Sequence, residues 1–331
     1  MNRKKMMVYN LREFDEREYF TKYAEEYGLE ILSSSETPTL ENAYLADSCD
    51  YVNVITTPIN EELLKVFKKQ GTKYLVTRTI GYDHIDLKAA KSLDIKIAHT
   101  PYGPDGVAEY TILLMLMCIR KMKSIRHRFL GQDYTLKGLI GKELSDMTIG
   151  VIGTGRIGTR LIKMLSGFGC KVFAYSVHKN PELEGYTEYC SLDELFKKSD
   201  LITLHMASTD ETEHMIDDNA INKMKDGVVL INTARGSLIN TQAIIRGLNT
   251  GKISSLGIDV VEDESALFYY DRREDILPNS DLYLLNSYPN VVITHHMAFY
   301  TDHAVETMVK DSLKGAYLDI NGKDNPFVVS K

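Results

Sequence analysis

Three ionisable residues stand just beyond apolar runs in the second half of this 331-residue chain. Arg235, Glu264 and His296 each follow a short segment rich in valine, isoleucine and leucine. Arginine provides a planar, permanently charged fork for a carboxylate. Histidine titrates near neutrality and can donate a proton, and a carboxylate beside it favours and orients the charged ring. These residue types suit the reduction of a 2-oxo acid, which needs a cation for the carboxylate, a proton for the new alkoxide and a hydride.

A glycine-rich turn could hold the donor of that hydride. Its residues are Gly153-Thr154-Gly155-Arg156-Ile157-Gly158, directly after an apolar segment and directly before a helical pattern. The first glycine permits a tight turn, the second lets the backbone approach a pyrophosphate, and the third lets helix and strand pack closely. The N–H groups at the start of the helix then face the phosphates. The turn therefore predicts a dinucleotide-binding site.

The choice between the two nicotinamide dinucleotides depends on the end of the next expected strand, 171–175. An acid there would accept a hydrogen bond from the ribose 2′-hydroxyl of NAD. The chain has Ser176, His178 and Lys179 instead. Because these side chains can bind a 2′-phosphate that an acid would repel, the sequence favours NADP(H) over NAD(H). An NAD(H) enzyme that merely lacks the acid stays the alternative.

The elements that position these residues follow an α/β pattern. Apolar runs alternate with helical patterns, which indicates two doubly wound parallel sheets with helices on both faces. The expected strands of the first sheet are 6–9, 31–32, 52–56, 74–77 and 95–98, and those of the second are 148–152, 171–175, 201–205, 228–232, 256–260 and 291–294. Ligands bind at the carboxyl ends of such strands, where the three ionisable residues would converge.

The chain should form two domains, because 331 residues exceed one ordinary core. Residues 1–101 plus 300–331 are expected to form a flavodoxin-like substrate domain, and 102–299 a Rossmann dinucleotide-binding domain, with a cleft between them. A helix over 104–123 would carry the chain into the second domain. A helix over 302–318 would return it to the first.

Bulk composition excludes several classes of protein. A hydrophobic content of 44% and a charged content of 26% are typical of a globular chain, and a net charge of −7 disfavours nucleic-acid binding. The four cysteines form no C-x-x-C pair, so we expect neither disulfides nor a metal site; they are Cys49, Cys118, Cys170 and Cys190. No signal peptide or membrane span is recognisable, which favours a cytoplasmic protein. The apolar stretch 107–119 is expected to be a buried helix at a subunit interface.

Over essentially its whole length the chain resembles the D-isomer-specific 2-hydroxyacid dehydrogenases. The resemblance rests on the glycine turn and on the segments 232–236 (NTARG), 259–264 (DVVEDE) and 296–301 (HMAFYT). Segments 77–86 and 102–104 are also similar to family segments. Within the family the chain is most similar to the D-lactate dehydrogenases, especially the vancomycin-resistance type, which also has Ala-Tyr-Ser where most members have an acid.

The resemblance implies a role for each of the three ionisable residues. Arg235 would bind the substrate carboxylate and polarise the carbonyl, Glu264 would be the partner of the histidine, and His296 would be the general acid and base. The family usually has proline before this histidine, whereas the chain has His295. The strand-to-motif register still selects His296.

The resemblance also implies contacts to both ligands. The backbone at Ile80 and Gly81 would bind the substrate carboxylate. Thr233 and Asp259 would lie near the nicotinamide, and His205 near the adenosine. A homodimer is expected because family members are commonly dimers.

Two aromatic residues bear on the size of the substrate. Tyr102 and Phe299 stand where the similar lactate enzymes have pocket walls that leave room for little more than a methyl group. This favours pyruvate and D-lactate. A methylene is worth only about 1–3 kcal/mol of discrimination, so larger 2-oxo acids leading to hydroxyisocaproate, phenyllactate or hydroxyglutarate stay alternatives. A nicotinamide-sensing binding protein on the same fold is a further alternative, which the presence of all three ionisable residues argues against.

Overall fold

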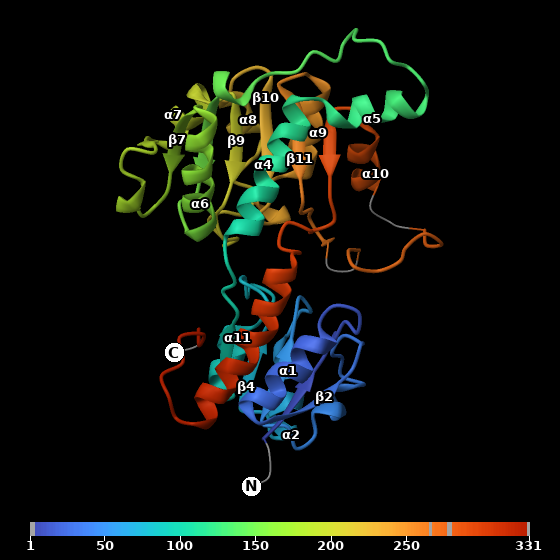
Figure 1. Cartoon of the computed structure of the whole chain (residues 1–331), viewed down its shortest axis with the longest axis vertical. Coiled ribbons are helices and arrows are strands. Elements are labelled where there is room, and N and C mark those ends of the chain that lie inside the picture. The colour runs from blue at the N-terminus through green and yellow to red at the C-terminus, as the bar shows by residue number, and fades with distance from the viewer. Residues whose placement is uncertain (1–3, 265–266, 277–279, 330–331) are drawn as a thin grey trace. The chain divides into compact units, whose positions relative to one another are not determined.

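The computed structural model describes residues 4–264, 267–276 and 280–329 and forms two compact units. The first unit comprises Met1–Gly103 and Tyr300–Lys331, and the second comprises Pro104–Phe299. Residues 1–3 and 330–331 of the expected first domain lie outside the described residues. Each unit contains one parallel sheet with helices packed on it (Figure 1). The division of labour between substrate and cofactor domains stays a prediction.

The sheet of the first unit has the flavodoxin-like strand order β2-β1-β3-β4-β5, as expected. Its strands are β1 (Lys4–Val8), β2 (Leu29–Ser33), β3 (Tyr51–Val54), β4 (Tyr74–Thr77) and β5 (Lys96–His99). One face packs against α1 (Arg17–Tyr27) and α11 (Asp302–Ile320), which lie side by side in Figure 1. The other packs against α2 (Glu61–Gln70), α3 (Leu87–Ser92) and the 3-10 turn η1 (Ala43–Ala46). Residues from both ends of the chain thus build one unit.

The sheet of the second unit has the order β12-β11-β10-β9-β6-β7-β8. Its strands are β6 (Thr148–Ile152), β7 (Lys171–Tyr175), β8 (Glu188–Tyr189), β9 (Leu201–Leu204), β10 (Val228–Asn232), β11 (Ile253–Ile258) and β12 (Val291–Ile293). All six expected strands are present. The prediction of six was wrong by one, because β8 has only two residues and is too short for a periodic pattern. This is a doubly wound dinucleotide-type sheet with an added edge strand.

Two layers of helices cover this sheet. On one face lie α4 (Asp105–Ile119) and α6 (Arg156–Leu165). On the other lie α7 (Leu192–Lys198), α8 (Asp218–Lys223) and α9 (Thr241–Asn249). A further helix, α10 (Ser280–Ser287), contacts β12. The central strands are therefore buried on both faces and present only their ends to ligands.

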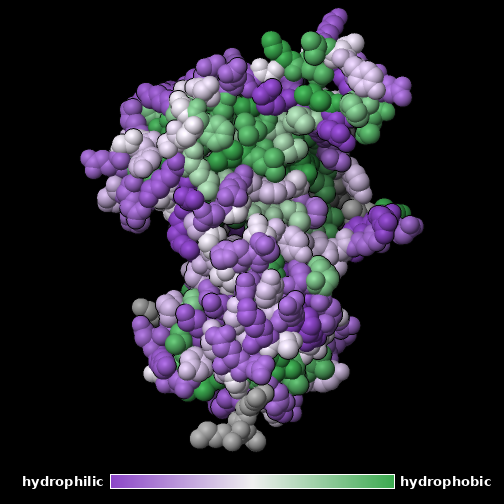
Figure 2. Space-filling model, viewed as in Figure 1, coloured by the Kyte–Doolittle hydropathy of each residue, from purple (hydrophilic) through white to green (hydrophobic). Residues whose placement is uncertain are grey.

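The helix expected over 104–123 is two helices. α4 ends at Ile119, and Lys121 has a left-handed backbone (φ 53°) before α5 (Met122–Leu130) begins. α4 is apolar around most of its circumference, whereas α5 has no buried residue. The prediction missed the break because no glycine or proline marks it. Figure 2 shows apolar side chains gathered over α4 in this view of the second unit.

The described residues contain neither a membrane-spanning helix nor a cluster of metal ligands. None of their helices is long and apolar enough to cross a membrane. Residues 4–264, 267–276 and 280–329 also contain no group of three or more His, Cys, Asp or Glu side chains that could hold a metal ion.

Candidate active site

The glycine turn connects β6 to α6 through three glycines with different constraints. A Cβ atom on Gly153 (φ 97°) would lie 2.4 Å from the carbonyl oxygen of His205, and one on Gly158 would lie 2.0 Å from the carbonyl oxygen of Gly153. A Cβ on Gly155 would meet nothing within 4 Å. Gly153 and Gly158 are therefore fixed by packing within the protein, whereas Gly155 leaves an open approach at the N-terminus of α6. This arrangement fits a pyrophosphate.

The residues that follow β7 lie against the glycine turn. The hydroxyl of Thr154 donates to the backbone carbonyl of His178 over 3.4 Å. The hydroxyl of Tyr189 donates to Thr154 Oγ1 (3.0 Å), and the ammonium of Lys179 lies 5.7 Å from the centre of the Tyr189 ring. The side chains of His178 and Lys179 are exposed, and Ser176 is half-buried. The exposed side chains of His178 and Lys179 are hydrogen-bond donors within reach of a ligand beside the turn.

His205 and Thr233 have packed positions in the second unit. His205 Nε2 lies 2.9 Å from Thr203 Oγ1, and burial lowers the pKa of His205 to about 3. Thr233 is buried, and its hydroxyl lies 2.8 Å from that of Thr111 on α4. His205 is consequently neutral at ordinary pH and supports the glycine turn through its backbone.

The side chain of Asn232 holds the backbone of the loop after β10, which contains Arg235. Asn232 Nδ2 donates to the carbonyl of Arg235 (2.8 Å), and Asn232 Oδ1 accepts from the N–H of Ala234 (3.0 Å). A Cβ on Gly236 would lie 2.1 Å from the carbonyl carbon of Val261, in the loop after β11. Gly236 therefore lets the Arg235 loop contact the loop that carries Glu264.

Glu264 and His296 form a direct pair. His296 Nδ1 lies 2.5 Å from Glu264 Oε1, and both side chains are about one-fifth exposed. The other carboxylate oxygen accepts from the N–H of Val261 (3.0 Å). Because Nδ1 donates to the carboxylate, Nε2 is the ring nitrogen that can face a substrate.

Asp259 holds the backbone of the turn that contains His296. Its fully buried carboxylate accepts from the N–H groups of Met297 and Ala298, each at 2.8 Å, and from the hydroxyl of Thr294 at 2.5 Å. Its own carbonyl accepts from the N–H of His296 (2.7 Å). The polar atoms of Asp259 thus serve the turn, and its expected place near the nicotinamide stays a prediction.

In the first unit, two backbone carbonyls of the segment after β4 are held by side chains. The carbonyl of Ile80 accepts from His99 Nδ1 (2.8 Å), and the carbonyl of Gly81 accepts from Thr79 Oγ1 (2.6 Å). The N–H groups of Ile80 and Gly81 have no protein acceptor within the described part of the chain. Fixed carbonyls with unused neighbouring amides suit an anion.

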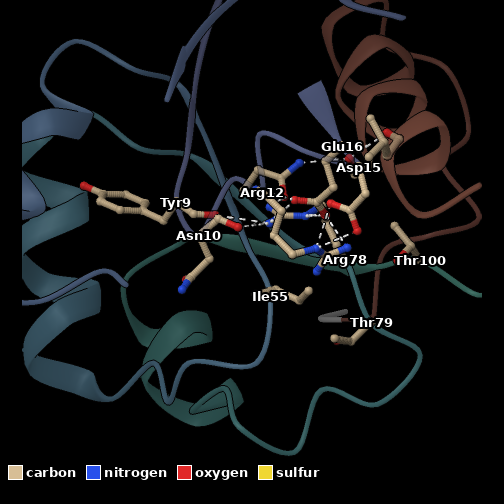
Figure 3. A network of polar contacts seen from close by, with 12 residues as sticks. Tyr9, Asn10, Arg12, Asp15, Glu16, Ile55, Arg78, Thr79 and Thr100 are labelled. Carbon is tan, nitrogen blue, oxygen red and sulfur yellow. Dashed lines mark hydrogen bonds and ion pairs between the residues drawn. The ribbon is translucent and has the colours of Figure 1, made fainter. Parts of the chain in front are cut away.

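A buried arginine anchors the start of that segment (Figure 3). Arg78 is fully buried and pairs with the equally buried Glu16, with Nε 3.1 Å from Oε1. Its Nη1 donates to Asn53 Oδ1 (2.7 Å), and its Nη2 donates to the carbonyls of Tyr9 and Asn10. Arg78 therefore ties the end of β4 to β3 and to the loop between β1 and α1.

The aromatic candidates lie in different units. Tyr102, in the first unit, is buried. Phe299, in the second, is half-buried, and its ring centre lies 6.1 Å from that of His296 in an edge-on arrangement. His295 is exposed and meets Phe268 edge-on at 6.4 Å, so it points elsewhere than the Glu264 pair.

Sequence reasoning missed several supporting residues. His214 Nε2 lies 2.6 Å from Glu262 Oε1, and Glu262 also accepts from the N–H of Thr241, which joins three loops at the carboxyl edge of the sheet. Tyr269 donates to the carbonyl of His296 (2.8 Å). No local spacing signals these long-range bonds. In the sequence, only the presence of an acid at position 262, two residues before Glu264, could have indicated a supporting residue.

A family model described as "D-isomer specific 2-hydroxyacid dehydrogenase, NAD binding domain" matches residues 112–298. The aromatic 2-oxoacid reductase of Clostridium sporogenes is 42% identical over 314 residues, which are 93% of this chain and 94% of that protein. The D-lactate dehydrogenase of Escherichia coli is 35% identical, covering 94% of this chain and 95% of that protein. The solved structure of a D-2-hydroxyisocaproate dehydrogenase superposes with a TM-score of 0.88 at 34% identity, covering 99% of this chain and 100% of that one.

Proposed function

The chain belongs to the D-isomer-specific 2-hydroxyacid dehydrogenases, and from that premise we propose that it reduces pyruvate to D-lactate with a hydride from NAD(P)H. Members of this family are nicotinamide-dependent oxidoreductases acting on D-2-hydroxy acids, and that class of reaction holds for this chain. The observation that carries the proposal is the Glu264–His296 pair at 2.5 Å beside the loop of Arg235.

His296 is the proposed general acid in the reduction. When bound, the nicotinamide supplies the hydride that forms the new C–H bond at C2 of the 2-oxo acid. The carbonyl oxygen gains the electron pair of the C=O π bond, and the proton on His296 Nε2 moves to it, giving the hydroxyl. The carboxylate of Glu264 accepts from Nδ1 and stabilises the imidazolium before transfer. The same atoms run in reverse for oxidation.

Arg235 is the proposed carboxylate-binding cation. Its guanidinium can form two parallel charge-assisted hydrogen bonds with a carboxylate and can polarise the adjacent carbonyl. We also propose the amides of Ile80 and Gly81 as donors to the carboxylate, since their N–H groups are unused while their carbonyls are fixed.

The proposed dinucleotide site is the open turn at Gly155, with Arg156 and Ile157 at the start of α6. We further propose NADP(H) as the preferred cofactor. Ser176, His178 and Lys179 end the strand where an acid would select NAD(H), and the two longer side chains are exposed beside the turn. We propose Thr233 and Asp259 as neighbours of the nicotinamide, and His205 as a neighbour of the adenosine.

A second candidate substrate is an aromatic 2-oxo acid. The C. sporogenes relative that is 42% identical is an aromatic 2-oxoacid reductase. In this chain the ring of Phe299 and the ring of Tyr269 lie 6.1 and 6.3 Å from that of His296. Aromatic faces beside the general acid favour a planar substrate side chain. Pyruvate stays the first candidate because the resemblance to the D-lactate dehydrogenases implies that Tyr102 and Phe299 restrict the pocket.

We propose that the working form is a homodimer built through α4, α5 and the segment 131–140. Six large apolar side chains of these elements are exposed, namely Leu113, Phe129, Leu130, Tyr134, Leu136 and Ile140. Exposed apolar side chains on elements that follow one another in the chain are typical of a protein interface.

One experiment tests the proposed function. Pyruvate, phenylpyruvate, 4-methyl-2-oxopentanoate and 2-oxoglutarate are each offered with NADH and with NADPH, and kcat/KM is measured from cofactor oxidation. The expected result is the highest value for pyruvate with NADPH. A higher value for phenylpyruvate selects the second substrate, and a strong NADH preference overturns the cofactor proposal. Cofactor binding without turnover of any 2-oxo acid would favour a nicotinamide-sensing binding protein.

A further inference from the structure

The loops around the Glu264–His296 pair hold unusual backbone conformations. Nine non-glycine residues have a positive φ among those that the structure describes. Four of them, His214, Asp263, Tyr269 and His296, belong to the segments that surround this pair. Left-handed backbone at non-glycine residues costs free energy and persists where surrounding contacts require it. The clustering indicates that these loops are held in place by specific bonds.

His296 itself is one of the four, with φ 57°. Its N–H donates to the carbonyl of Asp259 and its side chain donates to Glu264. Its carbonyl accepts from the hydroxyl of Tyr269 over 2.8 Å. The general acid is therefore fixed at three points: backbone N–H, backbone carbonyl and ring.

Tyr269 is the most unusual of the four. Its φ is 70°, a conformation that histidine and aspartate adopt far more readily than a bulky aromatic residue. Half of its surface is exposed, so core packing does not force the conformation. Its contacts to His296 are the hydroxyl bond and a ring 6.3 Å from the imidazole. The strained backbone thus coincides with a bond to the proposed general acid.

We propose that Tyr269 is a positioning residue for His296, and that Glu264 and Tyr269 together hold the histidine by its ring and its carbonyl. This inference rests on the proposed function. The hydroxyl of Tyr269 touches no reacting atom in this proposal and acts through the backbone of His296. The hydroxyl of Tyr269 therefore governs the rate of proton transfer, whereas the ring, which faces the imidazole, is kept in Tyr269→Phe, so that variant should bind substrate and cofactor as the wild type does.

The next residue provides a matched control. Tyr270 has nearly the same exposure, 49% against 50%, and its ring faces the guanidinium of Arg272 at 4.9 Å instead of His296. Replacing either tyrosine by phenylalanine removes one hydroxyl and keeps the ring. Only Tyr269→Phe removes the bond to His296.

The test compares Tyr269→Phe with Tyr270→Phe in steady-state kinetics. Tyr269→Phe should lower kcat about three- to tenfold, the effect of one neutral hydrogen bond, while KM for the 2-oxo acid and for the cofactor changes less than twofold. Tyr270→Phe should match the wild type. Equal kcat in both variants, or a loss of Tyr269→Phe confined to KM, would overturn the proposal.

A second measurement does not depend on turnover. Hydrogen–deuterium exchange of the peptide spanning 294–300 should be faster in Tyr269→Phe than in the wild type and Tyr270→Phe, because the turn loses one of its three anchors. Tyr269→Asn, which tolerates the left-handed backbone but lacks the phenol, should behave like Tyr269→Phe. Unchanged exchange in both Tyr269 variants would also overturn the proposal. A wild type that turns over no 2-oxo acid would instead refute the proposed function and leave this exchange test standing.

Discussion

The chemistry of His296 depends on how its two ring nitrogens are assigned. Glu264 takes Nδ1, which leaves Nε2 for a substrate. Asp259 is close to Glu264 in the sequence, but its carboxylate has different partners. It accepts hydrogen bonds from two backbone N–H groups and a hydroxyl. Of these two acids, which are five residues apart, Glu264 orients the imidazole ring and Asp259 stabilises the backbone of the turn.

The positions of the three candidate residues at one edge of the sheet could be predicted from the sequence, whereas the bonds that hold their loops could not. Arg235, Glu264 and His296 follow strands 10, 11 and 12, which are neighbours in the sheet, so their convergence follows from strand order. The bonds of Asn232, Asp259 and Tyr269 depend on how loops fold back over the sheet edge. Local pattern carries no information about such contacts.

His205 should make the stability of the protein sensitive to acid. Its folded pKa of about 3 lies below the ordinary 6.5, so as pH falls the unfolded chain binds the proton first. The contribution of His205 to the free energy of unfolding should therefore be fully present above pH 6.5 and should decline as pH falls toward 3. For this partly buried group the loss is about 1–2 kcal/mol at pH 5. Urea unfolding at pH 7 and pH 5 measures it. His205→Gln should reduce the difference between the two pH values, and an unchanged difference would contradict the assignment.

At the scale of elements, two glycines of the turn have different roles: Gly158 is required for packing within the protein, and Gly155 leaves space for a ligand. Gly158→Ala should lower the melting temperature, because its Cβ would lie 2.0 Å from a backbone carbonyl in the described structure. Gly155→Ala should leave the melting temperature unchanged and raise the cofactor dissociation constant, because its Cβ points into open space that a pyrophosphate would fill. Calorimetry and cofactor fluorescence titration check both. A Gly155→Ala variant that binds the cofactor as the wild type does would contradict the placement of the pyrophosphate at this turn.

The Arg78–Glu16 pair should be essential to the first unit. Arg78→Met would leave Glu16 buried beside β4 with fewer partners, at a cost of about 3–5 kcal/mol in the free energy of unfolding. Arg78→Met combined with Glu16→Gln should recover part of that loss, since the uncompensated charge is removed. Urea unfolding followed by circular dichroism measures both variants. A single variant as stable as the wild type would show that the pair contributes nothing.

Elements were predicted where hydrophobic periodicity was strong. Strands β6, β7 and β10 were expected with the bounds that the structure has, because each is a buried parallel strand with a continuous apolar run. The break at Lys121 and the short β8 were missed. At both places the deciding interactions are tertiary: the carbonyl of Ile119 accepts from the N–H of Lys142, and β8 exists only through its pairing with β7.

At the scale of the whole molecule, the apolar surface of α4, α5 and 131–140 tests the dimer proposal. Leu136→Asp with Ile140→Asp should give a monomer, because each charge would enter an apolar interface at a substantial desolvation cost. Light scattering coupled to gel filtration measures the mass. Val177→Asp, at an apolar side chain on the loop after β7 that is exposed to a similar degree, is the control and should stay dimeric. A monomeric wild type would contradict the proposal.

Membership of the family establishes a hydride transfer on D-2-hydroxy acids, and the proposed mechanism requires His296 to supply the proton. The most direct measurement is chiral chromatography of the product that the wild type and His296→Asn form from pyruvate and NADPH, with cofactor binding followed in parallel. The wild type should form D-lactate alone, and His296→Asn should lose at least a hundredfold in rate while retaining its cofactor affinity. L-lactate, a racemic product, or a variant that reduces pyruvate as fast as the wild type would contradict the proposed mechanism.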